Sequence, residues 1–373
     1  MKNIKRTIAL TIFLLILSGT WHVYGSDIVS LDDFDLSSAK NSLSTAGYSK
    51  LSGKEFINYI ITGNFGKVFV ICKDLIYEKT IGDTKFIYHT LGEIIIVIIL
   101  SAFFTNFTNV FTKNNVSETA FYICYLVVIT IIITLFNAMS NTTVEFVKLI
   151  IGFLYGIIPG YFLSVAITGQ ITAAGFYQFT LVVIGVAEFV FLNVIIPLIK
   201  IYVAIGIVNN VSAEDFLSKT ADVIKNIINF FIKFFIGIVT GLNIIQALVL
   251  PAIDGAKNTT IRKFVGSMPV IGDGADALTG VVLGSVNLIK NTIGTFAIVA
   301  ILILCMVPFL KIQIYSLSVQ ITTALVQPIA DKRITGSLSI LNTGIKMLSK
   351  IIIGTGVLFI LSIAIICMVT GKE

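Results

Sequence analysis

The chain has 373 residues, of which 56% are hydrophobic and only 12% are charged, and its formal net charge at pH 7 is +6. Soluble domains carry about 25% charged residues, so this composition excludes an ordinary water-soluble globule. The basic residues are spread without a long run of lysine or arginine, which argues against a nucleic-acid partner. The apolar residues gather in stretches close to the roughly 20 residues that a helix needs to cross a bilayer.

These apolar stretches predict helices rather than strands. In lipid, backbone N–H and C=O groups must be satisfied inside helices or closed barrels. The stretches are continuous runs of Ile, Val, Leu and Phe, without the inside–outside alternation of barrel strands. We therefore expect an all-α, polytopic integral membrane protein with membrane lipid as its surroundings.

The first 25 residues predict a secretory signal peptide. A basic start and a short apolar core over residues 8–17 precede small or modest side chains that end at Gly25. The alternative is an uncleaved first helix. Residues 26–86 are polar and hold many charges, so we expect a translocated N-terminal region, followed by a membrane domain over residues 87–373.

Seven apolar stretches are each long enough for a membrane span. They cover residues 87–111, 119–139, 146–168, 173–196, 231–252, 292–310 and 351–370. Residues 198–210 are too few for an independent span, which favours a re-entrant piece or a kinked continuation. The expected count is seven, or eight if this segment crosses.

The loop over residues 311–350 predicts the orientation. It contains five basic residues against one acid, Asp331, and such loops stay in the cytoplasm under the positive-inside rule. With a translocated N-terminus, this location requires an even number of spans. The loop over residues 253–291 is also basic, which weakens the inference.

Two short patterns recur and suggest internal repeats, which are common in transporter-like folds. Three spans open with a lysine that is followed four residues later by glycine, and two others end near a proline followed three residues later by lysine. The lysines of the first pattern are Lys148, Lys233 and Lys350, and those of the second are Lys200 and Lys311. The expected unit is a span, a proline kink, a surface helix and a second span, although chance can also produce such patterns in an isoleucine-rich chain.

Two segments beside the spans predict amphipathic helices. Residues 213–230 and 329–349 each carry apolar side chains at helical spacing with polar residues on the other face. Helices of this kind commonly lie flat in the membrane interface. Docking to partner helices is the functional alternative.

Glycines four residues apart predict close approach of helix backbones, since packing replaces the missing hydrophobic drive in lipid. The positions expected to pack helices are Gly152, Gly156, Gly160, Gly237 and Gly241. The sequence leaves open whether these seams lie within one chain or between chains, so a homo-oligomer is one of the open alternatives.

The polar segment over residues 251–290 is the most unusual part of the chain. Asp273 and Asp276 suit the N-cap and third position of a helix, where carboxylates meet unpaired N–H groups. Capping is the structural interpretation, and a re-entrant or pore-side element is the functional one. The residues expected at an interface or lumen here are Arg262, Lys263, Gly272, Asp273, Asp276, Gly280 and Gly284.

Motifs within and after this segment resemble the stage III sporulation protein AE family. They lie at residues 262–266, 269–276, 288–294 and 327–333, and the resemblance covers nearly the full chain. It adds Asp331, Lys332 and Arg333 to the residues expected at an interface or lumen.

The resemblance implies a spore-forming bacterium and a place in the multiprotein channel that links the mother cell to the engulfed forespore. The implied partners are the other stage III sporulation A-operon proteins and a forespore channel protein. The implied location is the mother-cell membrane facing the forespore. The family is not marked by catalytic signatures.

Two other functions are weighed against a channel component. An enzyme is not expected, because the only histidines are His22 and His89 and the four cysteines show no CxxC spacing, so no catalytic, cofactor or metal site is predicted. A stand-alone secondary transporter is the stronger alternative. Ionisable residues inside spans are functional candidates, and the acids expected there are Glu93 and Glu188.

Overall fold

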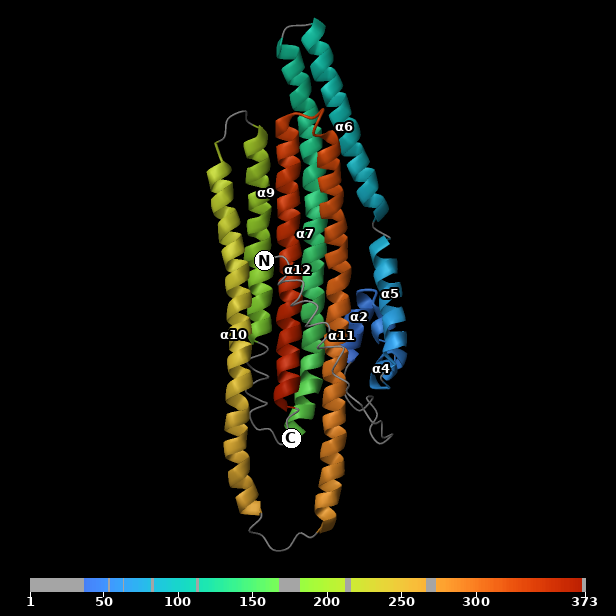
Figure 1. The fold of residues 1–373 in the computed structure, drawn as a ribbon, viewed down its shortest axis with the longest axis vertical. Coiled ribbons are helices and arrows are strands. Elements are labelled where there is room, and N and C mark those ends of the chain that lie inside the picture. Colours follow the sequence, from blue (N-terminus) through green and yellow to red (C-terminus); the bar gives the residue numbers. More distant parts are fainter. Residues whose placement is uncertain are drawn as a thin grey trace.

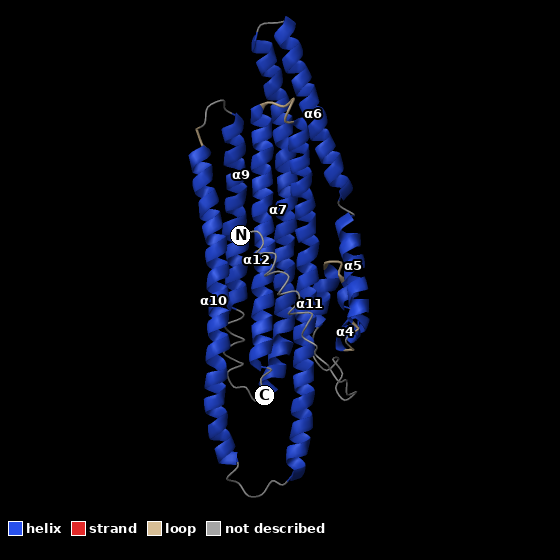
Figure 2. Cartoon of the chain, viewed as in Figure 1, coloured by secondary structure: helices blue, strands red, loops and turns tan. Residues whose placement is uncertain are grey.

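The computed structural model describes residues 37–52, 54–62, 64–81, 84–111, 114–167, 182–211, 216–265 and 273–370. These residues are helical apart from short turns and contain no strand, which confirms the expected all-α fold (Figure 1, Figure 2). The expected signal peptide at residues 1–25 lies outside the described residues.

Short helices come first in the described chain, and long ones follow. The short helices are α2 (Ser37–Thr45), α3 (Ser49–Ser52), α4 (Lys54–Ile61) and α5 (Phe65–Ile81). The long part consists of α6 (Thr84–Phe111), α7 (Asn114–Ile167), a π-helical turn η2 (Val190–Ile195), α9 (Ile196–Val211), α10 (Ser218–Val265), α11 (Asp273–Val326) and α12 (Lys332–Thr370).

The longest helices exceed the thickness of a bilayer. Helices α7 and α11 have 54 residues each, and α10 has 48. At about 1.5 Å per residue these helices are about 70–80 Å long, whereas the hydrocarbon core of a bilayer is about 30 Å thick. Part of each of them therefore lies outside the hydrocarbon of a single bilayer.

Helix α7 joins two stretches that the sequence predicts as separate spans, 119–139 and 146–168, so the expected break between them is wrong. The polar residues in the middle do not end the helix, because their hydroxyl groups bond within it. Thr142 Oγ1 and Thr143 Oγ1 each donate to the carbonyl four residues earlier, at 3.1 and 3.0 Å. Bonds of this kind satisfy a polar side chain inside a continuous helix.

Residues 182–211 also form one helix, so the uncertain segment 198–210 continues the element before it. Pro197 lacks the N–H that an α-helix needs at that position. The π-helical turn η2 stands directly before it, and the Ile196 N–H donates to the Phe191 carbonyl, five residues back. The turn thus changes the hydrogen-bond register where the proline enters, as π-bulges do inside α-helices.

Both expected surface helices are parts of longer helices. Residues 213–230 belong largely to α10, where Val223 is 56% exposed, and Phe216 just before the helix is 70% exposed. Residues 329–349 belong largely to α12, and the apolar stripe there is buried in the bundle instead of lying in the interface. Its members are at most 1% exposed, namely Ile334, Leu338, Leu341, Ile345 and Leu348.

Five segments of the described chain are long and apolar enough to cross a membrane. They are Phe121–Pro159, Val182–Val211, Ser218–Gly241, Ile293–Val326 and Lys332–Ala364. A shorter apolar stretch, Leu91–Phe103, lies in α6. The expected seven or eight spans and the repeat unit are not confirmed, because several apolar windows of about 20 residues fall on the same helix.

Helix α12 lies at the centre of the bundle. It packs against α7, α9, α10 and α11, and α6 runs along α7 (Figure 1). The α9–α10 and α11–α12 hairpins turn at the same end, where α12 begins (Figure 1). The short helices α2, α4 and α5 lie partway along the bundle against α7 and α11.

Glycines on α12 receive side chains from all four of its neighbours. An added Cβ at each of these glycines would come within 3.0 Å of the partner side chain. The pairs are Gly336 with Asn210 of α9, Gly344 with Val203 of α9 and Phe136 of α7, Gly354 with Ile236 of α10, and Gly356 with Cys305 of α11. These glycines let α12 approach every helix around it closely.

Gly156 provides a similar contact between α7 and the N-terminal helices. An added Cβ at Gly156 would lie 2.5 Å from the Ala39 backbone nitrogen in α2, and Ala39 is fully buried. One turn earlier, an added Cβ at Gly152 would lie 3.7 Å from its nearest neighbour, the Ser42 hydroxyl.

Other glycines singled out by spacing differ from Gly156. An added Cβ at Gly237 or Gly241 on α10 would have no neighbouring atom within 4 Å. The surroundings of Gly160 lie outside the described residues. Among the described positions, spacing alone therefore does not separate a packed glycine from one that faces open space.

We predict that Gly156→Ala destabilises the protein, whereas Gly152→Ala does not. The new methyl group at position 156 meets backbone atoms of α2, which cannot rotate away, and overpacking of this kind costs about 1–3 kcal/mol. At position 152 there is room, and alanine favours a helix over glycine by about 0.5–1 kcal/mol. Thermal unfolding of both variants in detergent measures the difference. Equal midpoints would contradict the described contact between α2 and α7.

Candidate functional site

The polar segment that the sequence singles out is described only in part. Helix α11 begins at Asp273, close to the expected helix start, and Gly280 and Gly284 lie in its body. Arg262 and Lys263 lie in the last turn of α10. Gly272 and the side chains of the other residues, Asp276 among them, lie outside the described part, so capping and a lumen-lining role stay predictions.

The two acids expected inside spans lie in different environments. Glu93 on α6 is exposed, and its Oε1 lies 3.2 Å from His89 Nδ1, one turn earlier. Glu188 is half-buried and lies near the Tyr155 hydroxyl of α7. Among the residues that the structure describes, no ion pair joins Glu188 to a base.

The start of α12 brings together the third group of expected residues. Asp331 Oδ1 accepts a hydrogen bond from the Arg333 backbone N–H at 2.8 Å, and the Asp331 carbonyl accepts from Ile334 and Thr335. This is the geometry of an N-cap, in which a carboxylate satisfies an N–H that has no partner in the helix. Lys332 is exposed beside it.

Arg333 reaches from α12 across to α7. Its Cζ lies 5.1 Å from the ring centre of Phe121 and 5.7 Å from that of Tyr122. Its Nη1 also donates to the Tyr122 hydroxyl at 3.3 Å, and its Nε lies 4.0 Å from Asp331 Oδ1. A guanidinium over two rings at these distances makes a cation–π contact that stabilises the approach of the two helices.

One turn further into the bundle, a buried hydrogen bond joins the same two helices. Tyr125 Oη and Ser337 Oγ are 2.9 Å apart, and Ser337 Oγ donates to the Arg333 carbonyl at 2.9 Å. The tyrosine must then donate to the serine. Phe121 stacks on Tyr125 at 5.7 Å between ring centres. We call this set of Phe121, Tyr122, Tyr125, Arg333 and Ser337 the α7–α12 clamp.

The clamp contains residues that the sequence analysis did not select. Of these residues the sequence predicts only Arg333 at a site, and it places Phe121, Tyr122 and Tyr125 in an ordinary apolar span. Three aromatic residues within five positions at the start of a span, two of them with a hydroxyl, are a usable signal for a buried polar contact. The position of the serine that pairs with them cannot be read from the sequence alone.

A second polar feature crosses the bundle lower down. Four lysines on different helices lie at one height, and we call this set the lysine level. Its members are Lys200 on α9, Lys233 on α10, Lys311 on α11 and Lys350 on α12.

Hydrogen bonds and close contacts fix this common height. Lys350 Nζ donates to Asn229 Oδ1, one turn before Lys233, at 2.7 Å. Gln313 Nε2, two residues after Lys311, donates to the Ser349 hydroxyl at 2.9 Å.

A fourth lysine joins the level through α9. Lys148 on α7 does not, because the ring of Phe153 on α7 lies 6.0 Å from that of Phe296 on α11, which places Lys148 about two to three helical turns from Lys311. On α9, the contacts of Gly206 with Ile340 and of Val203 with Gly344 place Lys200 beside the next turn of α12.

The lysine level borders the most apolar parts of the long helices. The apolar run of α11 ends at Lys311, and the apolar runs of α10 and α12 begin after Lys233 and Lys350. Lysine side chains extend their amines into the interface at the ends of membrane-embedded helices. Four of the five lysines of the repeated sequence patterns thus share one level, which we interpret as an edge of the hydrocarbon core.

The described part of the chain contains no candidate metal centre. No group of three or more His, Cys, Asp or Glu side chains there could hold a metal ion. Cys72, Cys124 and Cys305 are free thiols. The side-chain contacts described above hold helices together, and the lysines place positive charge at one level of the bundle.

Comparisons with known proteins agree with the motifs. Residues 51–370 match a family model described as stage III sporulation protein AE. A curated protein named Stage III sporulation protein AE, from Bacillus subtilis (strain 168), is 22% identical over 278 residues, which cover 74% of this chain and 70% of that protein. No solved structure matches the chain.

We predict that Asp331→Ala weakens the α11–α12 turn and that Asp331→Asn does not. Alanine removes the oxygen that accepts from Arg333, which costs about 1 kcal/mol at an N-cap, whereas asparagine caps about as well as aspartate. Thermal unfolding of the purified variants measures the loss. If both variants lose equal stability, the carboxylate acts through its charge on Arg333 and not as a cap.

Proposed function

The chain belongs to the stage III sporulation protein AE family, and we propose that it is a membrane component of the multiprotein channel between mother cell and forespore. The family match over residues 51–370 is the observation that carries this proposal, since it places the chain in sporulation. The protein would reside in the mother-cell membrane that faces the forespore. Its partners would be the other stage III sporulation A-operon proteins and a forespore channel protein.

The length of the bundle supports a role in an assembly. Helices of 48 and 54 residues pass well beyond one hydrocarbon core. The parts outside the hydrocarbon present helix surface to the aqueous space, where other proteins can bind it. A protein that only had to anchor itself in the membrane would not need helices of this length.

The hairpin arrangement supports one orientation. Four segments long enough to cross a membrane, in α7, residues 182–211, α10 and α11, separate the N-terminal helices from the α11–α12 turn, and we propose that α6, with its shorter apolar stretch Leu91–Phe103, crosses as a fifth pass. An odd number of passes puts these two parts on opposite sides of the membrane. With the N-terminal helices translocated, the turn with Lys332 and Arg333 is cytoplasmic, in agreement with the positive-inside rule.

The orientation predicts a pattern of thiol labelling. Gln327 in the α11–α12 turn and Asn64 before α5 are both exposed, so a cysteine at either position is sterically reachable. In a background without native cysteines, Asn64→Cys should react with a membrane-impermeant maleimide in intact cells. Gln327→Cys should react only after the cells are opened. Labelling of both positions in intact cells would contradict an odd number of passes between them.

Co-purification from sporulating cells tests the proposed function. A tagged copy that replaces the native protein should support spore formation and should isolate with other A-operon proteins after mild solubilisation. An unrelated tagged polytopic protein serves as the control. Isolation of the chain alone, together with ion-coupled uptake by purified protein in liposomes, would contradict the proposal and favour a stand-alone transporter.

A further inference from the structure

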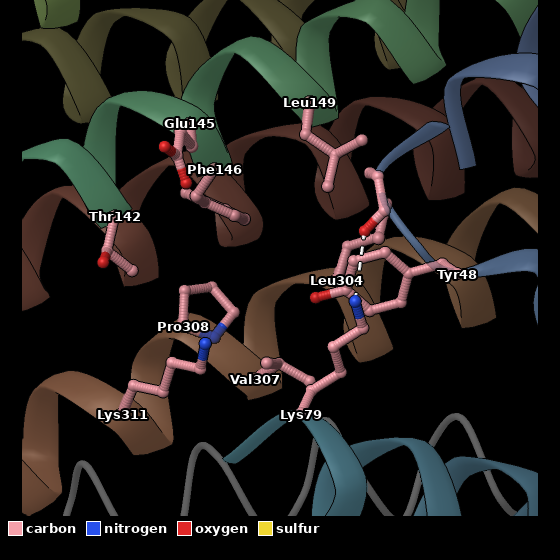
Figure 3. A pocket seen from close by; sticks show the side chains of 11 residues that line it. Tyr48, Lys79, Thr142, Glu145, Phe146, Leu149, Leu304, Val307, Pro308 and Lys311 are labelled. Carbon is pink, nitrogen blue, oxygen red and sulfur yellow. Dashed lines mark hydrogen bonds between the residues drawn. The ribbon is translucent and has the colours of Figure 1, made fainter. Parts of the chain in front are cut away.

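A pocket of about 360 Å³ lies at the lysine level between the N-terminal helices and the bundle. It is large enough for a small ligand or a lipid head group, since ligand pockets begin at about 300 Å³. Its walls come from four parts of the chain, namely the α2–α3 turn, α5, α7 and α11 (Figure 3). The pocket exists only because the N-terminal helices pack against the bundle.

Two ammonium groups reach the pocket from different helices. Lys79 of α5 and Lys311 of α11 both line it, and Figure 3 shows their side chains on the same side, with Glu145 across from them on α7. The sum of these charges is +1, from two lysines and one glutamate. The pocket therefore favours an anion, and the Glu145 carboxylate can accept a hydrogen bond from a hydroxyl on that anion.

Lys79 is held in place by the turn beside it. Its Nζ donates to the Ala46 carbonyl at 3.4 Å and lies 5.3 Å from the ring centre of Tyr48. Gly47 has φ of 78°, and a side chain there would meet the Lys79 amine. An ammonium has three N–H donors, and the bond to Ala46 uses one of them.

Neutral hydroxyl groups supplement the lysines. Tyr48 and Thr142 line the pocket. Burial, with a smaller contribution from nearby Cys305, raises the pKa of Tyr48 to about 12. The phenol therefore stays protonated at physiological pH and is available as a donor.

The opposite part of the lining is apolar. It is formed by Phe146, Leu149, Leu304, Val307 and Pro308. Glu145 is exposed, so the pocket reaches the outer surface of the bundle. A cationic end beside an apolar wall, at the edge of the hydrocarbon, matches the two ends of a phospholipid. A free inorganic anion would use the cationic end alone.

We propose that this pocket binds the phosphate head group of an anionic glycerophospholipid, with Lys79 and Lys311 on the phosphate and the apolar wall along the start of an acyl chain. Basic pockets between helices at the membrane interface bind such head groups. Glu145 accepts from a head-group hydroxyl, which favours phosphatidylglycerol. The lipid then fastens the N-terminal helices to α7 and α11.

Native mass spectrometry and thermal unfolding of the full chain in detergent test the proposal. Phosphatidylglycerol, phosphatidylcholine and inorganic phosphate are added separately to the wild type and to Lys311→Gln, Lys311→Arg and Lys200→Gln. Lys200 is an exposed lysine of the same level that does not line the pocket. Its variant therefore makes the same change of charge at a position outside the pocket.

Wild type should bind and be stabilised by phosphatidylglycerol, and Lys311→Gln should weaken this binding about fivefold, the effect of one interfacial lysine. Lys200→Gln and Lys311→Arg should bind as wild type does, and Lys311→Arg keeps the test valid if Lys311→Gln fails to fold. Equal binding by wild type and Lys311→Gln, or loss of binding in Lys311→Arg and Lys200→Gln alike, would overturn the proposal. Stabilisation by inorganic phosphate alone, equal to that by the lipid, would assign the pocket to a free anion and overturn the lipid.

Discussion

The bundle depends on the close approach of α12 to the four helices around it. Inside a bilayer the lipid tails are as apolar as the side chains, so helices gain little from leaving lipid and associate through packing and hydrogen bonds instead. Each atom pair at van der Waals contact contributes only about 0.1–0.2 kcal/mol, so many such pairs are needed. The glycines of α12 supply them, because side chains of α7, α9, α10 and α11 come within 3.0 Å of an added Cβ.

The polar contacts take their positions from this packing. The α7–α12 clamp forms where α12 begins, with the Tyr125–Ser337 hydrogen bond buried and the Arg333 guanidinium over the rings of α7. The lysine level forms about four to five turns further along α12. Between the two features α12 is held on all sides, so a change in one neighbour is felt by the others.

Length and the lysine level together explain why the membrane domain is not a simple set of spans. A helix of 54 residues contains more than two stretches of the length that a bilayer requires. The lysine level divides these helices into two parts, and one bilayer cannot hold both. The part outside the hydrocarbon is where the proposed channel partners would bind.

The all-α fold, the membrane location and the family could be predicted from the sequence, since these depend on composition and on contiguous motifs. The number and ends of the helices could not, because a window of about 20 residues does not show whether the chain between two windows stays helical. Around Thr142 it does, through bonds to carbonyls four residues back. The apolar stripe from Ile334 to Leu348 correctly predicts the buried face of α12. This face packs against other helices, however, and does not lie on the membrane surface.

The site was predictable only where one segment contains it. Asp331 and Arg333 lie in a recognisable motif, whereas their partners on α7 lie more than 200 positions away in the sequence. The recurring lysines were visible as patterns, but their common level is a property of how antiparallel helices align. Spacing also selected Gly237, which faces open space, and missed Gly344, which does not.

A disulfide between α9 and α12 tests the central position of α12 most directly. In a cysteine-free chain with a protease site inserted after Val265, Val203→Cys and Gly344→Cys should oxidise to a bond that holds the two fragments together without reductant. Val208, on the exposed face of α9, provides the control when it is paired with Gly344→Cys, and this pair should leave the fragments separate. Separate fragments for the first pair, or joined fragments for both, would contradict the described packing.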